Sequence, residues 1–260
     1  MHVDLTGQVA LVTGSATGLG HACAEAFSRA GADVALASSN LDDLAYASDR
    51  LHALGEGDVF SLESDIRDPS NVAALVDHTV EQYGGIDHLV TGPRQPEPDA
   101  LLEVEDEDWF RAFDRNFMSV VWACREAYPQ LDASPHGTVT NVTSPAIPAL
   151  ADDLAIASSF AGAVEAYTRT MARRTAPSVR VNAVIPGPHE SEDLERVLAD
   201  LVESGRYEGI EEAWAAVMAD APYDEPGDPL DLGRFVAFLV SEHANFVNGA
   251  TIAVDGGSSV

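Results

Sequence analysis

The amino-acid sequence predicts an α/β fold built on a doubly wound parallel sheet. Short apolar runs alternate with longer amphipathic runs along the 260 residues, and each strand-like run is followed by a helix-like one. The strand-like runs are almost continuously apolar, as expected for strands covered on both faces by crossover helices. The length and the hydrophobic fraction of 46% suit a single large domain over residues 1–260.

The first half of the chain contains four predicted strands and three predicted helices. Residues 9–13 form the first apolar strand, and the helix over 18–30 ends where Gly31 can adopt a left-handed conformation. The helix over 42–54 carries acidic residues in its first turn, where the helix dipole favours them. The helix over 71–83 ends at Gly84 and Gly85. The other strands of this half are predicted at 34–37, 59–62 and 88–91.

The second half contains two long predicted helices, at 106–131 and 154–175, on either side of a strand at 138–142. The last strands are predicted at 180–185 and 251–254. The segment 186–229 is the least regular and holds helix-like pieces at 191–204 and 210–220. Because insertions of this kind commonly cover a substrate, residues 189–228 are predicted to form a helical lid within the domain.

The charge of the chain excludes several classes of function. There are 43 acidic and 14 basic residues, a net charge of −29, and every basic residue is arginine. The absence of lysine excludes Schiff-base chemistry, a phosphate-loop lysine and a catalytic tyrosine–lysine pair. The acidic surface disfavours nucleic acid and anionic membranes as partners. We expect a haloadapted protein of a high-salt cytosol, because molar salt shortens the Debye length to about 3 Å and screens self-repulsion.

Other sequence features point to a cytoplasmic protein. No run reaches 18 apolar residues and the N-terminus lacks a basic region, so neither a membrane span nor a signal peptide is expected. Cys23 and Cys124 lie among apolar residues and are expected to be buried free thiols. No metal site is predicted.

A glycine-rich turn joins the first strand to the first helix. Residues 13–20 read Thr-Gly-Ser-Ala-Thr-Gly-Leu-Gly, with glycines at 14, 18 and 20. Such glycines permit a tight turn and let a pyrophosphate approach the helix N-terminus, where free N–H groups and the dipole favour an anion. The turn therefore predicts a dinucleotide site. The alternative is a helix start that only packs closely against the strand.

With this turn the chain resembles the short-chain dehydrogenase/reductase family, and within it the 3-oxoacyl-ACP-reductase-like subgroup. A Pro-rich stretch over 92–98 and the lid also match that subgroup. The resemblance covers essentially the whole chain and implies a Rossmann-type sheet of about seven strands. It also implies a small-molecule substrate, and homotetramers or homodimers formed through the two long helices. The other matching motifs are Asp65-Ile66, Asn116, Ser144, Pro186-Gly187, Asn248-Gly249 and Asp255-Gly256-Gly257.

The resemblance further implies a nicotinamide cofactor, NAD or NADP. In this family an acidic residue after the second strand binds the ribose 2′-hydroxyl of NAD, whereas an arginine pairs with the 2′-phosphate of NADP. The segment 37–40 reads Ala-Ser-Ser-Asn and carries neither charge, so the choice stays open. The positions that match the family's cofactor site are Gly14, Thr17, Gly18, Leu19, Gly20, Ser38, Ser39, Asp65, Ile66, Pro186 and Gly187.

The family's catalytic pair is missing from this chain. Its members use a tyrosine as general acid/base, a lysine four residues later, a serine on the substrate oxygen and an asparagine for a proton relay. Counting 13 residues from Ser144 leads to Ala157, and four more lead to Ala161. The resemblance therefore leaves Ser144 and Asn116 as the catalytic residues. The family's Asn-Ala-Gly after the fourth strand is also replaced, by Gly-Pro-Arg at 92–94.

Three functions remain open at this point. The first is an NAD(P)-dependent oxidoreductase acting on a ketone, an alcohol or a 3-oxoacyl-like substrate through an atypical proton path. The second is a catalytically degenerate relative that binds nucleotide or has a structural role. The third is a non-redox enzyme, such as a lyase or hydrolase, that uses the same pocket. Candidate replacements for the lost groups are Arg94, Asp152, Asp153, Ser158, Ser159 and His189.

Overall fold

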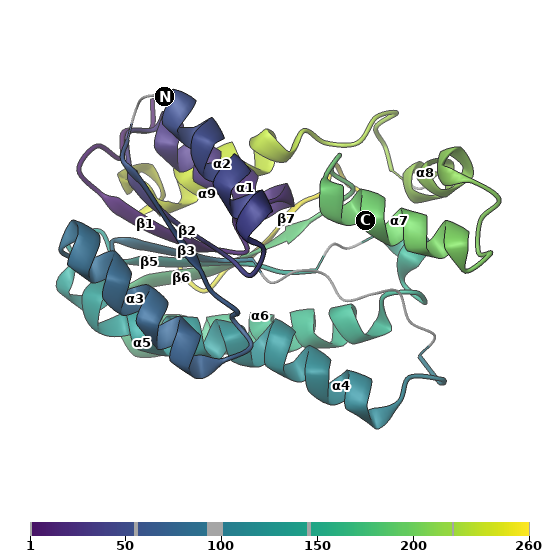
Figure 1. The fold of residues 1–260 in the computed structure, drawn as a ribbon, viewed down its shortest axis with the longest axis horizontal. Coiled ribbons are helices and arrows are strands. Elements are labelled where there is room, and N and C mark those ends of the chain that lie inside the picture. The colour runs from purple at the N-terminus through teal and green to yellow at the C-terminus, as the bar shows by residue number, and fades with distance from the viewer. Residues whose placement is uncertain (1, 55–56, 93–100, 145–146, 220, 260) are drawn as a thin grey trace.

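The computed structural model describes residues 2–54, 57–92, 101–144, 147–219 and 221–259. Within these ranges seven parallel strands form one sheet in the order β3-β2-β1-β4-β5-β6-β7, which confirms the predicted fold class (Figure 1). Each predicted strand is present, and no end moves by more than one residue. The strands are β1 (Val9–Thr13), β2 (Asp33–Ser38), β3 (Val59–Glu63), β4 (His88–Thr91), β5 (Thr138–Val142), β6 (Arg180–Pro186) and β7 (Thr251–Val254).

Helices cover both faces of the sheet (Figure 1). On one face α1 (Gly18–Arg29), α2 (Leu41–Leu54) and α9 (Pro229–Val240) bury one apolar cluster against the strands. On the other face α3 (Pro69–Tyr83), α5 (Ser119–Ala133) and α6 (Ala155–Thr175) bury a second cluster. The two layers explain why the strands are apolar on both sides.

Helix α9 lies between the predicted lid and the last strand, in a span to which no element is assigned from the sequence. Its start carries ordinary signals, because Asp228 caps it by accepting from the Leu230 N–H and Pro229 follows at the first turn. The helix packs closely on α1, since a Cβ at Gly233 would lie 2.2 Å from the carbonyl oxygen of Ala22. This contact is tertiary, and sequence periodicity does not reveal it.

The helix predicted over 106–131 is not continuous, which corrects that prediction. The structure has α4 (Asp106–Phe113), a π-helical turn η1 (Asp114–Met118) and then α5. Periodicity detects an apolar face and not the wider turn inside it, so the break was not foreseen. The turn contains Asn116 and therefore sets the direction of a predicted site residue.

Two helices, α7 (Glu192–Glu203) and α8 (Ile210–Met218), stand beyond the carboxyl ends of the strands (Figure 1). A third apolar cluster joins them to the segment before α6, including Leu150 and Leu154. An ion pair from Arg206 to Asp153, at 3.5 Å, connects the same two parts. These contacts hold the predicted lid segment against the body of the domain.

Two further expectations concern the cysteines and membrane-spanning helices. Cys23 and Cys124 are free and fully buried, as expected, and burial raises the pKa of each thiol to about 12. Across the described ranges, no helix combines the length and the apolar character needed to cross a bilayer.

Candidate functional site

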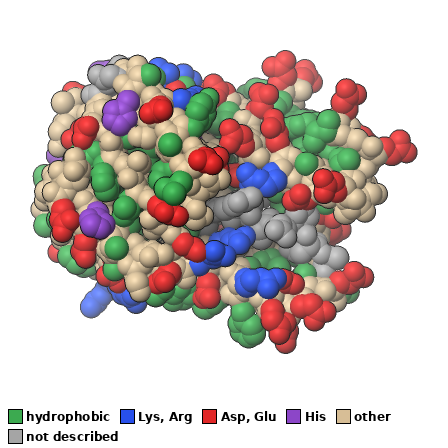
Figure 2. Space-filling model, viewed as in Figure 1, with side chains coloured by type: hydrophobic (Ala, Val, Ile, Leu, Met, Phe, Trp, Pro, Cys, Tyr) green, Lys and Arg blue, Asp and Glu red, His purple; other side chains and the backbone are tan. Residues whose placement is uncertain are grey.

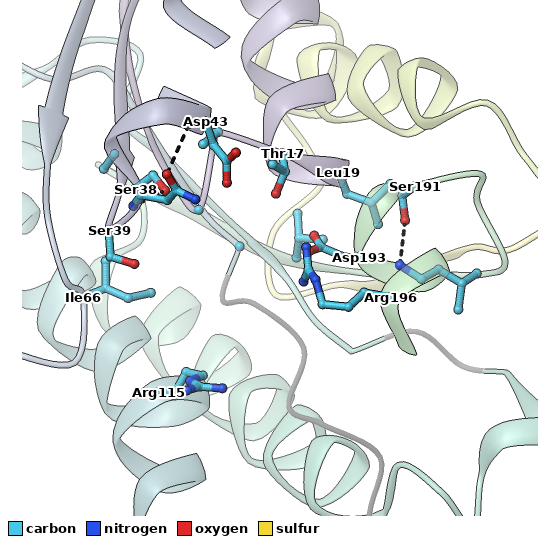
Figure 3. A pocket seen from close by; sticks show the side chains of 18 of the residues that line it. Thr17, Leu19, Ser38, Ser39, Asp43, Ile66, Arg115, Ser191, Asp193 and Arg196 are labelled. Carbon is cyan, nitrogen blue, oxygen red and sulfur yellow. Dashed lines mark hydrogen bonds and ion pairs between the residues drawn. The ribbon is translucent and has the colours of Figure 1, made fainter. Parts of the chain in front are cut away.

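A cavity of about 290 Å³ opens at the carboxyl ends of the strands, beside the switch point where β1 lies between β2 and β4 (Figure 3). In open α/β sheets this is where ligands bind. Its wall combines segments that are far apart in the sequence with the first turns of α7. The strand-end segments contribute Gly14, Ala16, Thr17, Leu19, Gly20, Ala37, Ser38, Ser39, Asn40, Ser64, Asp65, Ile66, Arg67, Gly92, Val142, Thr143, Gly187 and His189.

The three glycines of the turn have different tasks. A Cβ at Gly14 would lie 2.0 Å from the carbonyl oxygen of Gly92, and one at Gly20 would lie 2.1 Å from that of Gly14. These two glycines are required for close packing of the turn. Gly18 has φ +57°, and its missing Cβ would point at the lid residue Asp193. Gly18 therefore puts no side chain of its own at the start of α1, and the nearest side-chain atoms there belong to Asp193.

The first turn of α1 is arranged to receive an anion. Thr17 precedes the helix without a side-chain capping bond, and the first turn contains no acidic residue. The leading N–H groups of the helix thus keep their partial positive charge for an external acceptor. A cradle that a Cβ at Gly18 would fill, together with this helix end, fits the diphosphate of a dinucleotide.

Most of the predicted cofactor positions come together on this wall. Pro186 does not: it is buried behind the wall at the end of β6. Gly18 lines an adjoining pocket that shares Ala16 and Thr17 with the main cavity. The predicted positions in the wall itself are Gly14, Thr17, Leu19, Gly20, Ser38, Ser39, Asp65, Ile66 and Gly187.

The loop after β2 uses its polar groups internally. The Oγ of Ser38 accepts from the N–H of Asn40, at 3.2 Å. The Oδ1 of Asn40 accepts from the N–H groups of Asp42 and Asp43, at 3.0 and 3.3 Å, and so caps α2. Asp43 also lines the cavity, a position that the sequence analysis did not single out. Its position in the sequence could have indicated this place in the wall, since an acidic residue in the first turn of α2 lies one turn beyond the segment 37–40.

The loop after β3 carries an ion pair. Arg67 donates from Nε to Oδ1 of Asp65 at 2.9 Å and from a terminal nitrogen to Oδ2 at 2.6 Å. The hydrogen bond from Arg67, aided by the nearby charge of Arg115, holds the pKa of Asp65 below its ordinary value. Both arginines line the cavity and were not predicted. Asp65 therefore stays ionised with part of its acceptor capacity already used.

Asn116 lies in the π-helical turn and is buried. Within the described residues neither its Oδ1 nor its Nδ2 has a hydrogen-bond partner. Unpartnered buried amides are rare and call for a ligand or water. The preceding residue, Arg115, lines the cavity wall, whereas Asn116 itself does not.

Ser144 follows Thr143 at the end of β5 and is half-buried. Thr143 belongs to the wall, and its N–H donates to the carbonyl oxygen of Val184 at 2.9 Å. Ser144 itself stands one residue further along, outside the wall. The structure thus brings Ser144 to the edge of the cavity, on a segment anchored by β6.

Ala157, the position at which the resemblance places the family's tyrosine, is buried in an apolar cluster. Ala157 is 2% exposed and belongs to the apolar cluster that α7 and α8 form with the segment before α6. Leu194 and Val197 of α7 are in the same cluster and also line the cavity. A tyrosine at 157 would therefore have to fit its ring into this packed cluster. Ala161 is half-buried one turn further along α6.

Among the candidate replacements in the described residues, His189 alone lies in the wall. Ser158, Ser159 and Asp152 are exposed, and Asp153 is taken up by its ion pair with Arg206. Arg94 lies outside the described residues.

His189 is held in one orientation. Its Nδ1 donates to the carbonyl oxygen of Gly187 at 3.0 Å, which leaves Nε2 as the basic nitrogen. The ring packs on Gly227, where a Cβ would come within 2.9 Å of it. The ring is 5% exposed, and burial lowers its pKa. His189 is therefore neutral near pH 7.

The described residues contain no group of three or more potential ligands that could hold a metal.

Known proteins resemble this chain in sequence and in fold. A family model described as enoyl-(acyl carrier protein) reductase matches residues 14–259. A short chain dehydrogenase of Emericella nidulans is 31% identical over 258 residues, or 98% of this chain and 96% of that protein. A probable tetrahydroxynaphthalene reductase of Zymoseptoria tritici is 30% identical over 258 residues, or 97% and 94%. The crystal structure of L-sorbose reductase from Gluconobacter frateurii, complexed with NADPH and L-sorbose, matches with a TM-score of 0.91 at 26% identity and covers 100% of this chain and 99% of that one.

Proposed function

The chain belongs to the short-chain dehydrogenase/reductase family, and on that premise we propose that it is an NAD(P)-dependent oxidoreductase. Its substrate is a small ketone or alcohol, or a 3-oxoacyl-like compound. The observation that carries the proposal is the cavity that joins the glycine turn to the ends of β2, β3 and β6. The L-sorbose reductase with NADPH supports a nicotinamide cofactor. The proposal covers NAD and NADP alike.

Each part of the wall has a role in this proposal. The turn from Gly14 to Gly20 holds the diphosphate, and Asp65 with Ile66 lies against the adenine. When bound, the nicotinamide supplies or accepts the hydride. Ser144 donates a hydrogen bond to the substrate oxygen, and Asn116 supports a proton relay with its unpartnered amide.

The proton path in this proposal passes through His189 instead of a tyrosine. Its orientation and its lowered pKa leave a neutral Nε2 that can accept a proton from an alcohol near neutral pH. Because the folded pKa is lowered, the base is intact down to a lower pH than for a free histidine. We expect His189→Gln to remove the acidic limb of the pH–rate profile while cofactor affinity stays within about twofold. An unchanged profile would exclude His189 from the path.

One experiment tests the proposed function. NADH and NADPH are titrated by fluorescence in about 2 M KCl, and carbonyl compounds are then screened for cofactor oxidation. Given turnover, Ser144→Ala should lower kcat/KM about 100-fold or more, because a donor to the substrate oxygen is lost. Ser159→Ala is the matched control, since Ser159 is exposed on α6 and lies outside the wall. No cofactor binding in any condition would overturn the proposal.

The burial of Ala157 favours a second candidate function. Ala157 is buried in one apolar cluster with residues of α7 and α8, which supports a chain that keeps its dinucleotide site and lacks hydride transfer. In that case it is a nucleotide-binding or structural relative. Tight binding of NADH or NADPH without oxidation by any carbonyl would decide for this candidate. Losing a positioned acid/base costs about 10²- to 10⁴-fold in rate, so the assay needs that sensitivity.

The acidic surface and the exposed aromatics motivate two proposals about the protein's setting. Acidic side chains crowd the visible face (Figure 2), which suits a high-salt cytosol. A melting temperature that fails to rise with KCl would contradict this.

Phe110 of α4 is 68% exposed and Phe113 is 38% exposed, which supports a dimer or tetramer formed through the long helices. A monomeric mass in solution would contradict the assembly.

A further inference from the structure

An ion pair in the lid faces the glycine turn. Ser191 caps α7 by accepting from the N–H of Leu194 at 3.3 Å, which fixes the first turn of the helix. Three residues apart on that helix, Arg196 reaches Asp193 with an N–O distance of 3.1 Å. Both side chains line the main cavity, and Asp193 lies beside Thr17 (Figure 3). The pair thus belongs to the wall and not to the outer surface of the lid.

The carboxylate of this pair occupies the approach to the start of α1. The Oδ2 of Asp193 lies 2.4 Å from the position of a Cβ on Gly18, so it rests against the glycine itself. The first turn of α1 has no acidic residue of its own. A negative group is stabilised at such a helix end by the helix dipole. Asp193 therefore takes the place that the diphosphate of a dinucleotide needs.

The wall of the cavity carries equal numbers of basic and acidic side chains. Three arginines and three aspartates line the cavity, in a chain whose net charge is −29. Basic side chains gather in the same region, between the sheet body and the lid (Figure 2). Arg67 is bound to Asp65, and the charge of Arg115 acts on Asp65 as well. An incoming diphosphate can gain a guanidinium from the lid only if Arg196 leaves Asp193.

We propose that Arg196 is a ligand of the cofactor's diphosphate and that Asp193 holds the diphosphate position until the cofactor arrives. The proposal rests on dinucleotide binding as proposed above. Binding moves the Asp193 carboxylate away from Gly18, and Arg196 exchanges its carboxylate partner for phosphate oxygens. The side chain of Arg196 is 39% exposed, so it can turn within the cavity without unpacking the apolar face of α7. The lid thereby closes on a bound cofactor through a charge exchange.

The test compares Asp193→Asn and Arg196→Gln with the unmodified chain. A matched control exists on α9, where Arg234 and Asp231 form a pair of the same spacing at 2.7 Å outside the cavity. The control variants are Asp231→Asn and Arg234→Gln. The probes are NADH, ADP-ribose, which keeps the diphosphate, and AMP, which lacks it. Dissociation constants are measured at about 0.5 M and about 3 M KCl, and melting temperatures verify folding.

Asp193→Asn should tighten NADH and ADP-ribose about three- to tenfold at the lower salt and leave AMP unchanged. Arg196→Gln should weaken the same two ligands about tenfold or more, since a charge-assisted hydrogen bond is lost. Both changes in affinity should be smaller at the higher salt. The control variants should alter neither the affinity for NADH nor the affinity for ADP-ribose.

Three other results separate this inference from the proposed function. The charge exchange is wrong if NADH binds and neither lid variant alters its affinity, or if the variants change the affinity for AMP as much as that for NADH. Either result leaves the proposed cofactor site supported. If the lid variants change the affinities as expected and no carbonyl is reduced, the charge exchange is supported and the proposed oxidoreductase activity is wrong. If no variant binds NADH or ADP-ribose, both are overturned.

Discussion

Buried His88 should make the protein lose stability as the pH falls from 7 to 5. The side chain lies fully buried in β4, next to the strand that carries the glycine turn. Its Nδ1 pairs with the hydroxyl of Thr138 and its Nε2 with the side-chain oxygen of Gln8, both at 2.8 Å. A neutral ring with its proton on Nε2 satisfies both partners. A charged ring would be left without solvation, and burial lowers the pKa of His88 to about 3.

The size of the effect follows from the two pKa values. In the unfolded chain a histidine has a pKa of about 6.5, so at pH 5 it is about 97% protonated, whereas His88 in the folded chain stays neutral. The folded pKa is the lower one. The contribution of His88 is therefore intact above about pH 6.5 and is lost progressively as the pH falls towards 3. Between pH 7 and pH 5 the loss is about 2 kcal/mol.

The assay is urea unfolding at pH 7 and pH 5 in about 2 M KCl, for the unmodified chain, His88→Gln and His88→Met. Lower pH also reduces the net negative charge, but that change acts on all three proteins alike. Both variants should therefore show a pH difference in unfolding free energy that is smaller by about 2 kcal/mol than in the unmodified chain, whatever their stability at pH 7. The same pH dependence in all three would refute the reasoning, because it would mean that His88 is protonated without unfolding.

The remaining predictions concern packing and cofactor choice. Gly233→Ala should lower the free energy of unfolding by about 2 kcal/mol or more, because its Cβ would meet the Ala22 carbonyl at 2.2 Å; an unchanged urea midpoint would contradict the close approach of α1 and α9. Asp43→Asn should strengthen the binding of NADPH relative to NADH about three- to tenfold, since a wall carboxylate repels a 2′-phosphate. Equal changes in both dissociation constants would mean that the ribose 2′-position does not lie near Asp43. Ala157→Tyr should destabilise the domain by about 1–3 kcal/mol through overpacking beneath the lid, measured by thermal melting; a neutral result would mean that the lid moves aside.

The strand pattern and the turn signals were enough to predict the fold class and every strand of the sheet. Strands covered on both faces are mostly apolar, and glycines such as Gly31 mark left-handed helix ends, here with φ +87°. The same local logic located the glycine turn and the ends of β2 and β3, which meet at one edge because parallel strands end together. It also revealed that residues 157 and 161 carry only methyl groups.

What the sequence by itself did not determine depends on contacts between distant segments. The break at η1, the packing of α9 on α1 and the closure of the lid over Ala157 arise from tertiary packing, which leaves no period in the chain. The same is true of the charges in the cavity, where Arg115, Asp43 and the lid pair join residues already predicted. Sequence spacing shows which charges exist, whereas their pairing requires distances of a few ångströms, and only the folded chain sets those.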